Sequence, residues 1–174
     1  MNTMYTKNGA IKPRKSIVIH KNGKQIICPT HEMLIADGWA VYTKPEPTAE
    51  ELFERAKSEL KQSIINYDSS NAVNNFYMGK MPMWLDKATR TGLMLRFQSE
   101  QAIGKENTTL WYGTHSFTLP IATAIQMLFA IEAYASACYD NTQKHLANVE
   151  ELTLAKDVES YDYTIGYPEQ LHFG

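Results

Sequence analysis

Three aspartates have the residue type and the aromatic neighbours that acid–base chemistry would use: Asp68, Asp86 and Asp162. Two carboxyl groups that converge in a cleft could divide the acid and base roles, as in a small hydrolase. An aspartate at the entrance to a turn, however, usually accepts hydrogen bonds from nearby backbone N–H groups. We therefore expect all three aspartates to be local caps, and we keep a small hydrolase as a remote alternative.

The five histidines are scattered along the chain at His20, His31, His115, His145 and His172. His31 lacks the second histidine four residues later that a zinc-binding helix needs, and His145 lies on the polar side of a predicted helix, where we expect it to be exposed. The chain has no glycine-rich phosphate loop, paired-cysteine motif or Gly-x-Ser-x-Gly sequence. We therefore predict no catalytic, cofactor-binding or metal-binding residues, and no enzyme.

Charge is distributed unevenly along the 174 residues, although the net charge is only −2. Residues 1–47 hold seven basic and three acidic side chains, whereas residues 130–174 hold two lysines and eight acids. This asymmetry would suit head-to-tail contacts between subunits, and two solvated faces that never meet would explain it equally well. The basic segment is too sparse and too poor in aromatic residues to predict a nucleic-acid partner.

The long stretch from Pro120 to Val149 organises the rest of the chain. Its apolar residues recur at helical spacing, and Pro120 suits the first helical position. The opposite face carries polar side chains, so we expect one side to face water: Gln126, Glu132, Asp140, Lys144 and Glu151. Between Ala122 and Ala137 the stretch is apolar almost all round, which predicts burial on more than one side. Thr123, Gln126 and Glu132 interrupt it, so we do not expect it to cross a membrane.

The remaining elements predict an α+β fold with three parts. Residues 1–43 form a basic unit with an extended start, a hairpin over Asn22–Gly23, and a short helix capped by Thr30. Residues 44–66 form a proline linker and a capped connector helix that ends near Ile65. Residues 67–174 form the main domain.

The main domain is predicted to contain two hairpins, two main helices and an aromatic tail. Its first hairpin spans 73–85, with Pro82 on an edge strand, and Asp86 caps the helix that follows. Arg90 points outward from this helix, at ion-pair spacing from Asp86. A hairpin over 108–119 has Trp111 and Phe117 as its anchors. The tail, 161–173, is irregular because of Gly166 and Pro168, and it packs down.

Two cysteines, Cys28 and Cys138, are the only ones in the chain, and neither belongs to a paired motif. We expect two buried free thiols, which suits synthesis in a reducing compartment.

The chain from about Tyr67 to Phe173 carries a series of landmarks: YDSSNAVNNF (67–76), MWLDKATR (83–90), LWYG (110–113), IEAYASACYDNTQKH (131–145) and YDYTIGYPEQLHF (161–173). In this order they resemble a family of phage and prophage domains of unknown function. The segment IICPTHEMLIADGW (26–39) is similar to short modules of phage tail proteins. The motif residues, which we expect at core, cap and turn positions, are Tyr67, Asp68, Trp84, Asp86, Arg90, Trp111, Tyr134, Tyr161, Asp162, Gly166, Tyr167 and Pro168.

The resemblance implies a virion protein made in the cytoplasm of a bacterial host. Such domains occur with tail, tail-fibre and fibre-assembly proteins of tailed phages. The expected function is therefore structural, in a tail, a tail fibre or a head–tail connection, through contacts with other virion proteins and in a homo-oligomer. The alternative is a tail-fibre assembly chaperone that does not remain in the particle. Neither function requires a cofactor.

Overall fold

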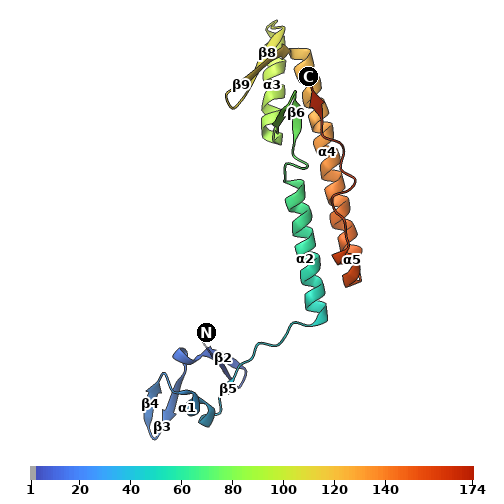
Figure 1. The fold of residues 1–174 in the computed structure, drawn as a ribbon. Coiled ribbons are helices and arrows are strands. Elements are labelled where there is room, and N and C mark those ends of the chain that lie inside the picture. The colour runs from blue at the N-terminus through green and yellow to red at the C-terminus, as the bar shows by residue number, and fades with distance from the viewer. Residues whose placement is uncertain (1–2) are drawn as a thin grey trace. The chain divides into compact units, whose positions relative to one another are not determined.

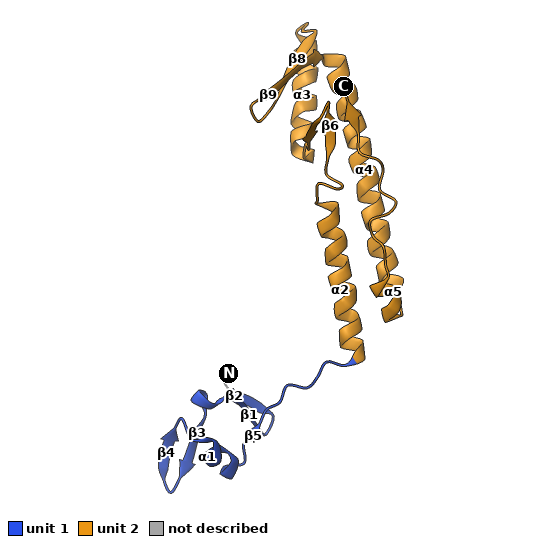
Figure 2. Ribbon diagram, in the orientation of Figure 1, with its two compact units in different colours: residues 1–48 blue, residues 49–174 orange. Residues whose placement is uncertain are grey.

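Turn residues and apolar periodicity give this chain both helices and small sheets, which confirms the predicted α+β class (Figure 1). The computed structural model describes residues 3–174. The chain divides into two compact units, residues 1–48 and residues 49–174 (Figure 2). The proline-containing segment 44–47 thus lies at the end of the first unit, and the helix after it belongs to the second unit rather than to a separate connector.

The first unit contains small β-sheets and one short α-helix. Its elements are β1 (Met4–Lys7), β2 (Ala10–Pro13), the 3-10 helix η1 (Arg14–Ser16), β3 (Val18–Lys21), β4 (Lys24–Ile27), α1 (His31–Ala36) and β5 (Ala40–Val41). The antiparallel order β2-β1-β5 makes one sheet, and β3 and β4 make a separate hairpin. The extended start predicted for residues 1–15 is wrong in the described part, because Asn8 and Gly9 adopt positive φ and reverse the chain into a hairpin.

In the first unit the predicted helix cap forms, whereas one of the two thiols is not buried as predicted. The side chain of Thr30 accepts a hydrogen bond from the backbone N–H of Met33, which confirms the predicted cap of α1. Tyr5, Ile17, Ile19 and Leu34 form the buried core. Cys28 is exposed, so the prediction of two buried thiols holds only for Cys138.

The second unit is built around its longest helix. Its elements are α2 (Ala49–Asp68), β6 (Phe76–Met78), β7 (Met81–Met83), α3 (Lys87–Ala102), β8 (Asn107–Tyr112), β9 (His115–Pro120), α4 (Ile121–Glu151), α5 (Ala155–Glu159) and β10 (His172–Phe173). Helices α2 and α3 pack against successive parts of α4 (Figure 1). Pro120 precedes the first turn of α4 as its N-cap, one position earlier than predicted.

Helix α2 runs one turn further than its sequence predicts. Tyr67 and Asp68, predicted to lie in a turn, are its last two residues. The buried Lys57 ammonium donates hydrogen bonds to the carbonyls of Glu150 and Leu152, at 2.8 and 3.3 Å, and so ties α2 to the end of α4. These contacts explain why α2 is an integral part of the second unit.

The β6–β7 hairpin forms as predicted, with Pro82 on an edge strand. Strand β10 adds to the other side of β6 in parallel. The tail therefore ends in a regular, if short, element beyond Gly166 and Pro168, which corrects the expectation that these residues exclude one. The predicted β8–β9 hairpin also forms. Trp111 does not anchor it, because its side chain is 68% exposed, whereas Phe117 packs toward Phe76 and Met83.

Candidate functional site

Motif residues from four separate segments meet in one aromatic cluster on α4. Tyr134 is buried there beside Cys138, and Tyr67, Trp84 and Tyr167 pack around them. The Tyr67 and Tyr167 rings meet edge to face at 5.4 Å, and Trp84 meets Tyr134 in the same way at 6.3 Å. Burial raises the pKa of both the Tyr134 hydroxyl and the Cys138 thiol, so both stay protonated at neutral pH. The cluster is a packed core with no free nucleophile.

A chain of hydroxyl groups joins this cluster to Asp68. Thr142, buried on α4, donates to Asp68 Oδ1 at 2.8 Å. Its Oγ1 lies 2.8 Å from the Tyr167 hydroxyl, which must be the donor in that contact because the Thr142 proton is already engaged. Asp68 therefore links α2 to α4 and the tail, which corrects its predicted role as a local cap.

The other two motif aspartates are local caps, as predicted. The backbone N–H of Thr89 donates to Asp86 Oδ1 at 2.7 Å and lowers the pKa of that carboxyl. The hydroxyl and backbone N–H of Thr164 donate to Asp162 Oδ1 and lower its pKa in the same way. Each of the three aspartates thus has a structural partner of its own.

His145 is buried, contrary to the prediction that it is exposed. Its side chain is only 7% exposed because the tail crosses over it. Nε2 lies 2.9 Å from the carbonyl of Ile165, which can only accept, so Nε2–H donates. Nδ1 lies 2.8 Å from the Tyr161 hydroxyl and accepts from it when the ring is neutral. The amide of Asn141 donates to the same Ile165 carbonyl at 2.9 Å. These contacts fasten the tail to α4.

Gly166 allows the tail to lie this close to α4. Its φ of +81° is a conformation that favours glycine, and a Cβ at this position would lie 2.6 Å from Asn141 Oδ1. Tyr167 and Pro168 follow, both half-buried. The motif in the tail is therefore a set of fastening and turn residues.

Arg90 is buried, although its helix position predicts an outward side chain. It is 8% exposed, and its Nε donates to Glu132 Oε2 at 2.7 Å while Nη1 donates to the carbonyl of Leu85 at 2.6 Å. The guanidinium also lies 5.7 Å from the ring centre of Trp84. The predicted Asp86 pairing is thus replaced by a pairing with Glu132 on α4.

A groove runs between α3 and α4 on both sides of the Arg90–Glu132 pair. It consists of two adjoining cavities, of about 430 and 420 Å³, that share these two residues. One cavity is lined by apolar side chains that include Leu95 and Phe129, and the other includes Tyr139. Leu95, Phe129 and Tyr139 are 66%, 55% and 59% exposed. We call this feature the α3–α4 groove.

The same side of α4 carries a regular stripe of exposed residues, which we call the α4 stripe: Ala122, Gln126, Phe129, Ala133, Ser136 and Asp140. Their spacing alternates between four and three residues, which is the repeat of a helix that packs along another helix. The sequence predicts burial of α4 on more than one side, and the single chain leaves this side open. Gln126 and Asp140 lie on the side that the sequence predicts to face water, whereas the exposure of Phe129 was not predicted.

By length and composition alone, α4 could also cross a membrane, and 39% of its most apolar 18-residue window is buried within the second unit. The buried residues of α4 include the polar Thr142 and His145, which bond to other elements of the unit. The expectation that the chain has no membrane partner stays a prediction. Residues 3–174 contain no group of three or more His, Cys, Asp or Glu residues that could hold a metal ion.

Comparison with known proteins finds no matching family model, no matching curated protein and no matching solved structure. The resemblance to phage domains therefore rests on the sequence landmarks alone. The second unit itself offers one surface for a partner: the exposed α4 stripe, with Phe129 at its centre, and the adjoining α3–α4 groove.

Proposed function

We propose that this protein is a structural component of a phage virion that joins subunits through the α4 stripe and the α3–α4 groove. The observation that carries the proposal is the open side of α4. Between Ala122 and Ala137 α4 is rich in apolar side chains, and the single chain covers only part of that surface, so burying the exposed Phe129 and its apolar neighbours would stabilise the helix. Phe129, exposed at the centre of this side, is the natural anchor of such a contact.

A second copy of the chain is the partner that fits best. Alternating spacings of four and three residues suit the packing of two like helices, and the small Ala122, Ala133 and Ser136 allow close approach. Beside the internal Arg90–Glu132 pair, the groove carries one charge of each sign, Lys87 and Asp140. A surface with both signs can pair with itself in a two-fold arrangement.

The virion setting is supported by the resemblance of residues 67–173 to phage domains. A fibre-assembly chaperone is the competing function, because an open apolar groove also suits transient binding of a client. Mass spectrometry of purified phage particles separates the two. The proposal expects the chain in stoichiometric amounts in the particle, and its absence would contradict the proposal.

Site-specific cross-linking tests the α4 contact directly. Cys28, which is exposed, is first replaced by Ser so that it cannot form disulfides. In this background Ala133→Cys places a thiol in the centre of the stripe, and Ser58→Cys places one on an exposed face of α2 as the matched control. We expect mild oxidation to cross-link the Ala133→Cys chain into dimers much faster than the control. Equal rates for the two variants would contradict contact through α4.

A further inference from the structure

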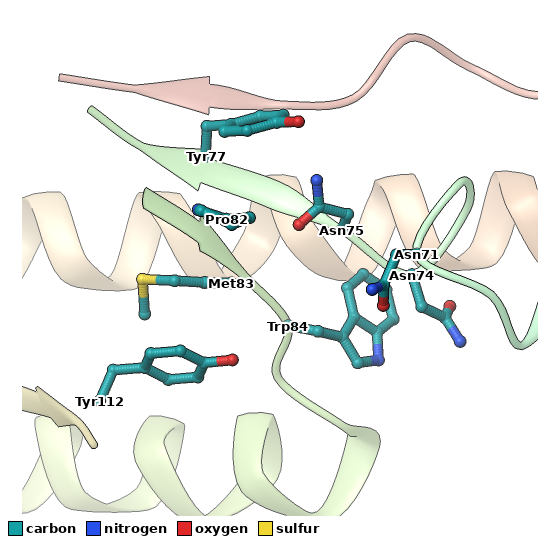
Figure 3. Close-up of a pocket in the computed structure, with 8 residues that line it drawn as sticks. All are labelled: Asn71, Asn74, Asn75, Tyr77, Pro82, Met83, Trp84 and Tyr112. Carbon is teal, nitrogen blue, oxygen red and sulfur yellow. The ribbon is translucent and has the colours of Figure 1, made fainter. Parts of the chain in front are cut away.

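A second, smaller cavity lies beside the β6–β7 hairpin, outside the α3–α4 groove. Its volume is about 300 Å³. Three asparagines from the loop after α2, Asn71, Asn74 and Asn75, contribute to its lining (Figure 3). Pockets of ~300–1,000 Å³ hold small ligands, so this one suits a single small chemical unit.

Strand alternation explains how polar and aromatic side chains come together here. Phe76 and Met83 face each other across the hairpin and enter the core, whereas Tyr77 and Pro82 form the neighbouring pair. In Figure 3 Asn71 and Asn74 lie beside the indole of Trp84. The ring of Tyr112 lies on the far side of Met83 from Tyr77 in the same view.

The asparagine loop is held in place from behind by the tail. Gln170 donates through Nε2 to the carbonyls of Asn71 and Ala72, at 3.0 and 2.9 Å. Its Oε1 accepts from the buried Asn75 amide at 3.3 Å. Within residues 3–174, the side chains of Asn71 and Asn74 make no hydrogen bond. The loop is therefore fixed while two of its amides remain available to a ligand.

The lining selects for an uncharged ligand rich in hydrogen-bonding groups. No charged side chain lines the cavity, so an ionic group would lose its hydration without gaining an opposite charge. Each asparagine amide offers donors and an acceptor, which match the neighbouring hydroxyls of a sugar. Trp84 and Tyr112 line the cavity with aromatic rings, which can pack on the C–H face of a pyranose. The Arg90 guanidinium covers one face of the Trp84 ring, and the Tyr77 ring stacks on His172 at 4.6 Å.

An extended peptide fits this place less well than a sugar. β7 is the edge strand here, but it is only three residues long and Pro82, at its centre, has no N–H to donate. Such an edge is poorly suited to adding another strand. Recognition must then come from the side chains of the cavity.

We propose that this cavity binds one neutral sugar residue, held by the amides of Asn71 and Asn74 against the indole of Trp84. Gln170 is the positioning residue that holds the asparagine loop. This site is independent of the α4 contact and does not require the proposed virion function.

Saturation-transfer NMR on the full chain tests the proposal with glucose, galactose and N-acetylglucosamine as probes. A monosaccharide site of this size is expected to have a Kd of roughly 1 mM for at least one of them, so titration to about 50 mM covers the range. The test variant is Asn71→Ala combined with Asn74→Ala, which removes two side chains that make no protein hydrogen bond. The matched control is Asn107→Ala, an exposed asparagine on β8.

Each lost hydrogen bond should weaken binding of the preferred sugar by about 2- to 12-fold, so the double variant should have a higher Kd than the native chain. The control should bind like the native chain. The proposal is overturned if none of the three sugars gives transfer at about 50 mM, or if the double variant binds as well as the control. Equal binding of glucuronate or of the tripeptide Gly-Gly-Gly would also overturn it, because either would show that the cavity does not select a neutral sugar.

Discussion

Replacing Tyr134 with Phe removes one oxygen atom from the centre of the aromatic cluster. The Tyr134 side chain is 4% exposed, and its hydroxyl donates to the carbonyl of Val73 at 2.7 Å. Phe leaves the ring and its packing against Trp84 in place. What is lost is the hydrogen bond to Val73. The buried Val73 carbonyl keeps a second donor, because the backbone N–H of Asn75 also donates to it at 2.9 Å.

The cost of this change follows from the burial of both partners. Because the Val73 carbonyl keeps its Asn75 donor, the loss is that of one buried hydrogen bond, about 0.5–1.5 kcal/mol of unfolding free energy, and we expect about 1 kcal/mol for Tyr134→Phe. Tyr139→Phe provides the matched control. It makes the same chemical change five residues later on α4, at a ring that is 59% exposed, and should stay within about 0.5 kcal/mol of the native chain.

Urea unfolding, followed through tryptophan fluorescence, measures both variants. Trp84 packs against Tyr134 and therefore reports on this cluster. The midpoint should fall for Tyr134→Phe with an unchanged slope, since the surface exposed on unfolding is nearly the same. If Tyr134→Phe and Tyr139→Phe have equal midpoints, the Val73 hydrogen bond contributes nothing and the argument from burial is refuted.

Further predictions concern pH, the tail and salt. Burial raises the pKa of Tyr134 and Cys138 in the folded state. As pH rises through about 8.5–10, the unfolded chain therefore loses these protons before the folded chain does. The urea midpoint should fall over this range, and a constant midpoint would contradict the prediction. Gly166→Ala should cost at least about 1–2 kcal/mol for its φ of +81°. Combined with Asn141→Ala it should cost less than the two single changes together, because the Cβ then meets no amide; strict additivity in a double-mutant cycle would refute the close contact. If the basic residues 1–47 meet the acidic residues 130–174 of a neighbour, light scattering should show a smaller mass above about 0.15 M salt, and an unchanged mass would exclude that contact.

The parts of the fold that depend on local chemistry could be predicted from the sequence. The Asn22–Gly23 turn, the Thr30 and Asp86 caps and the β6–β7 and β8–β9 hairpins each depend on a few adjacent residues. The apolar periodicity of α4 likewise extends over a single helix. These features require no knowledge of which distant segment packs where.

The Asn8–Gly9 hairpin is a local feature that the sequence interpretation missed. The errors at His145 and Arg90 instead involve partners that are distant in the sequence. His145 is buried by Tyr161 and Ile165, which lie 16 and 20 residues later in a tail without strong periodicity. Arg90 turns inward because Glu132, 42 residues away, lies opposite it on α4. Such pairings depend on how the helices and the tail are arranged, which local spacing does not determine.

The location of the candidate site was only partly predictable. The composition of α4 indicated burial on more than one side, but not which side the chain itself would cover. The α4 stripe became evident only once α2, α3 and the tail had their places. Trp111 was predicted to anchor its hairpin because it is a large aromatic residue. Strand alternation instead places it on the exposed face of the β8–β9 hairpin.

Sedimentation velocity across a concentration series tests the central claim, that the open side of α4 joins subunits, most directly. The test compares the native chain with Phe129→Asp, which places a charge at the centre of the α4 stripe, and with Trp111→Asp, which places one at an exposed aromatic residue of the β8–β9 hairpin. We predict that the native chain and Trp111→Asp form the same defined oligomer and that Phe129→Asp sediments as a monomer with an unchanged fold. A native chain that remains monomeric at every concentration, or a Phe129→Asp chain that assembles like the native one, would contradict the claim.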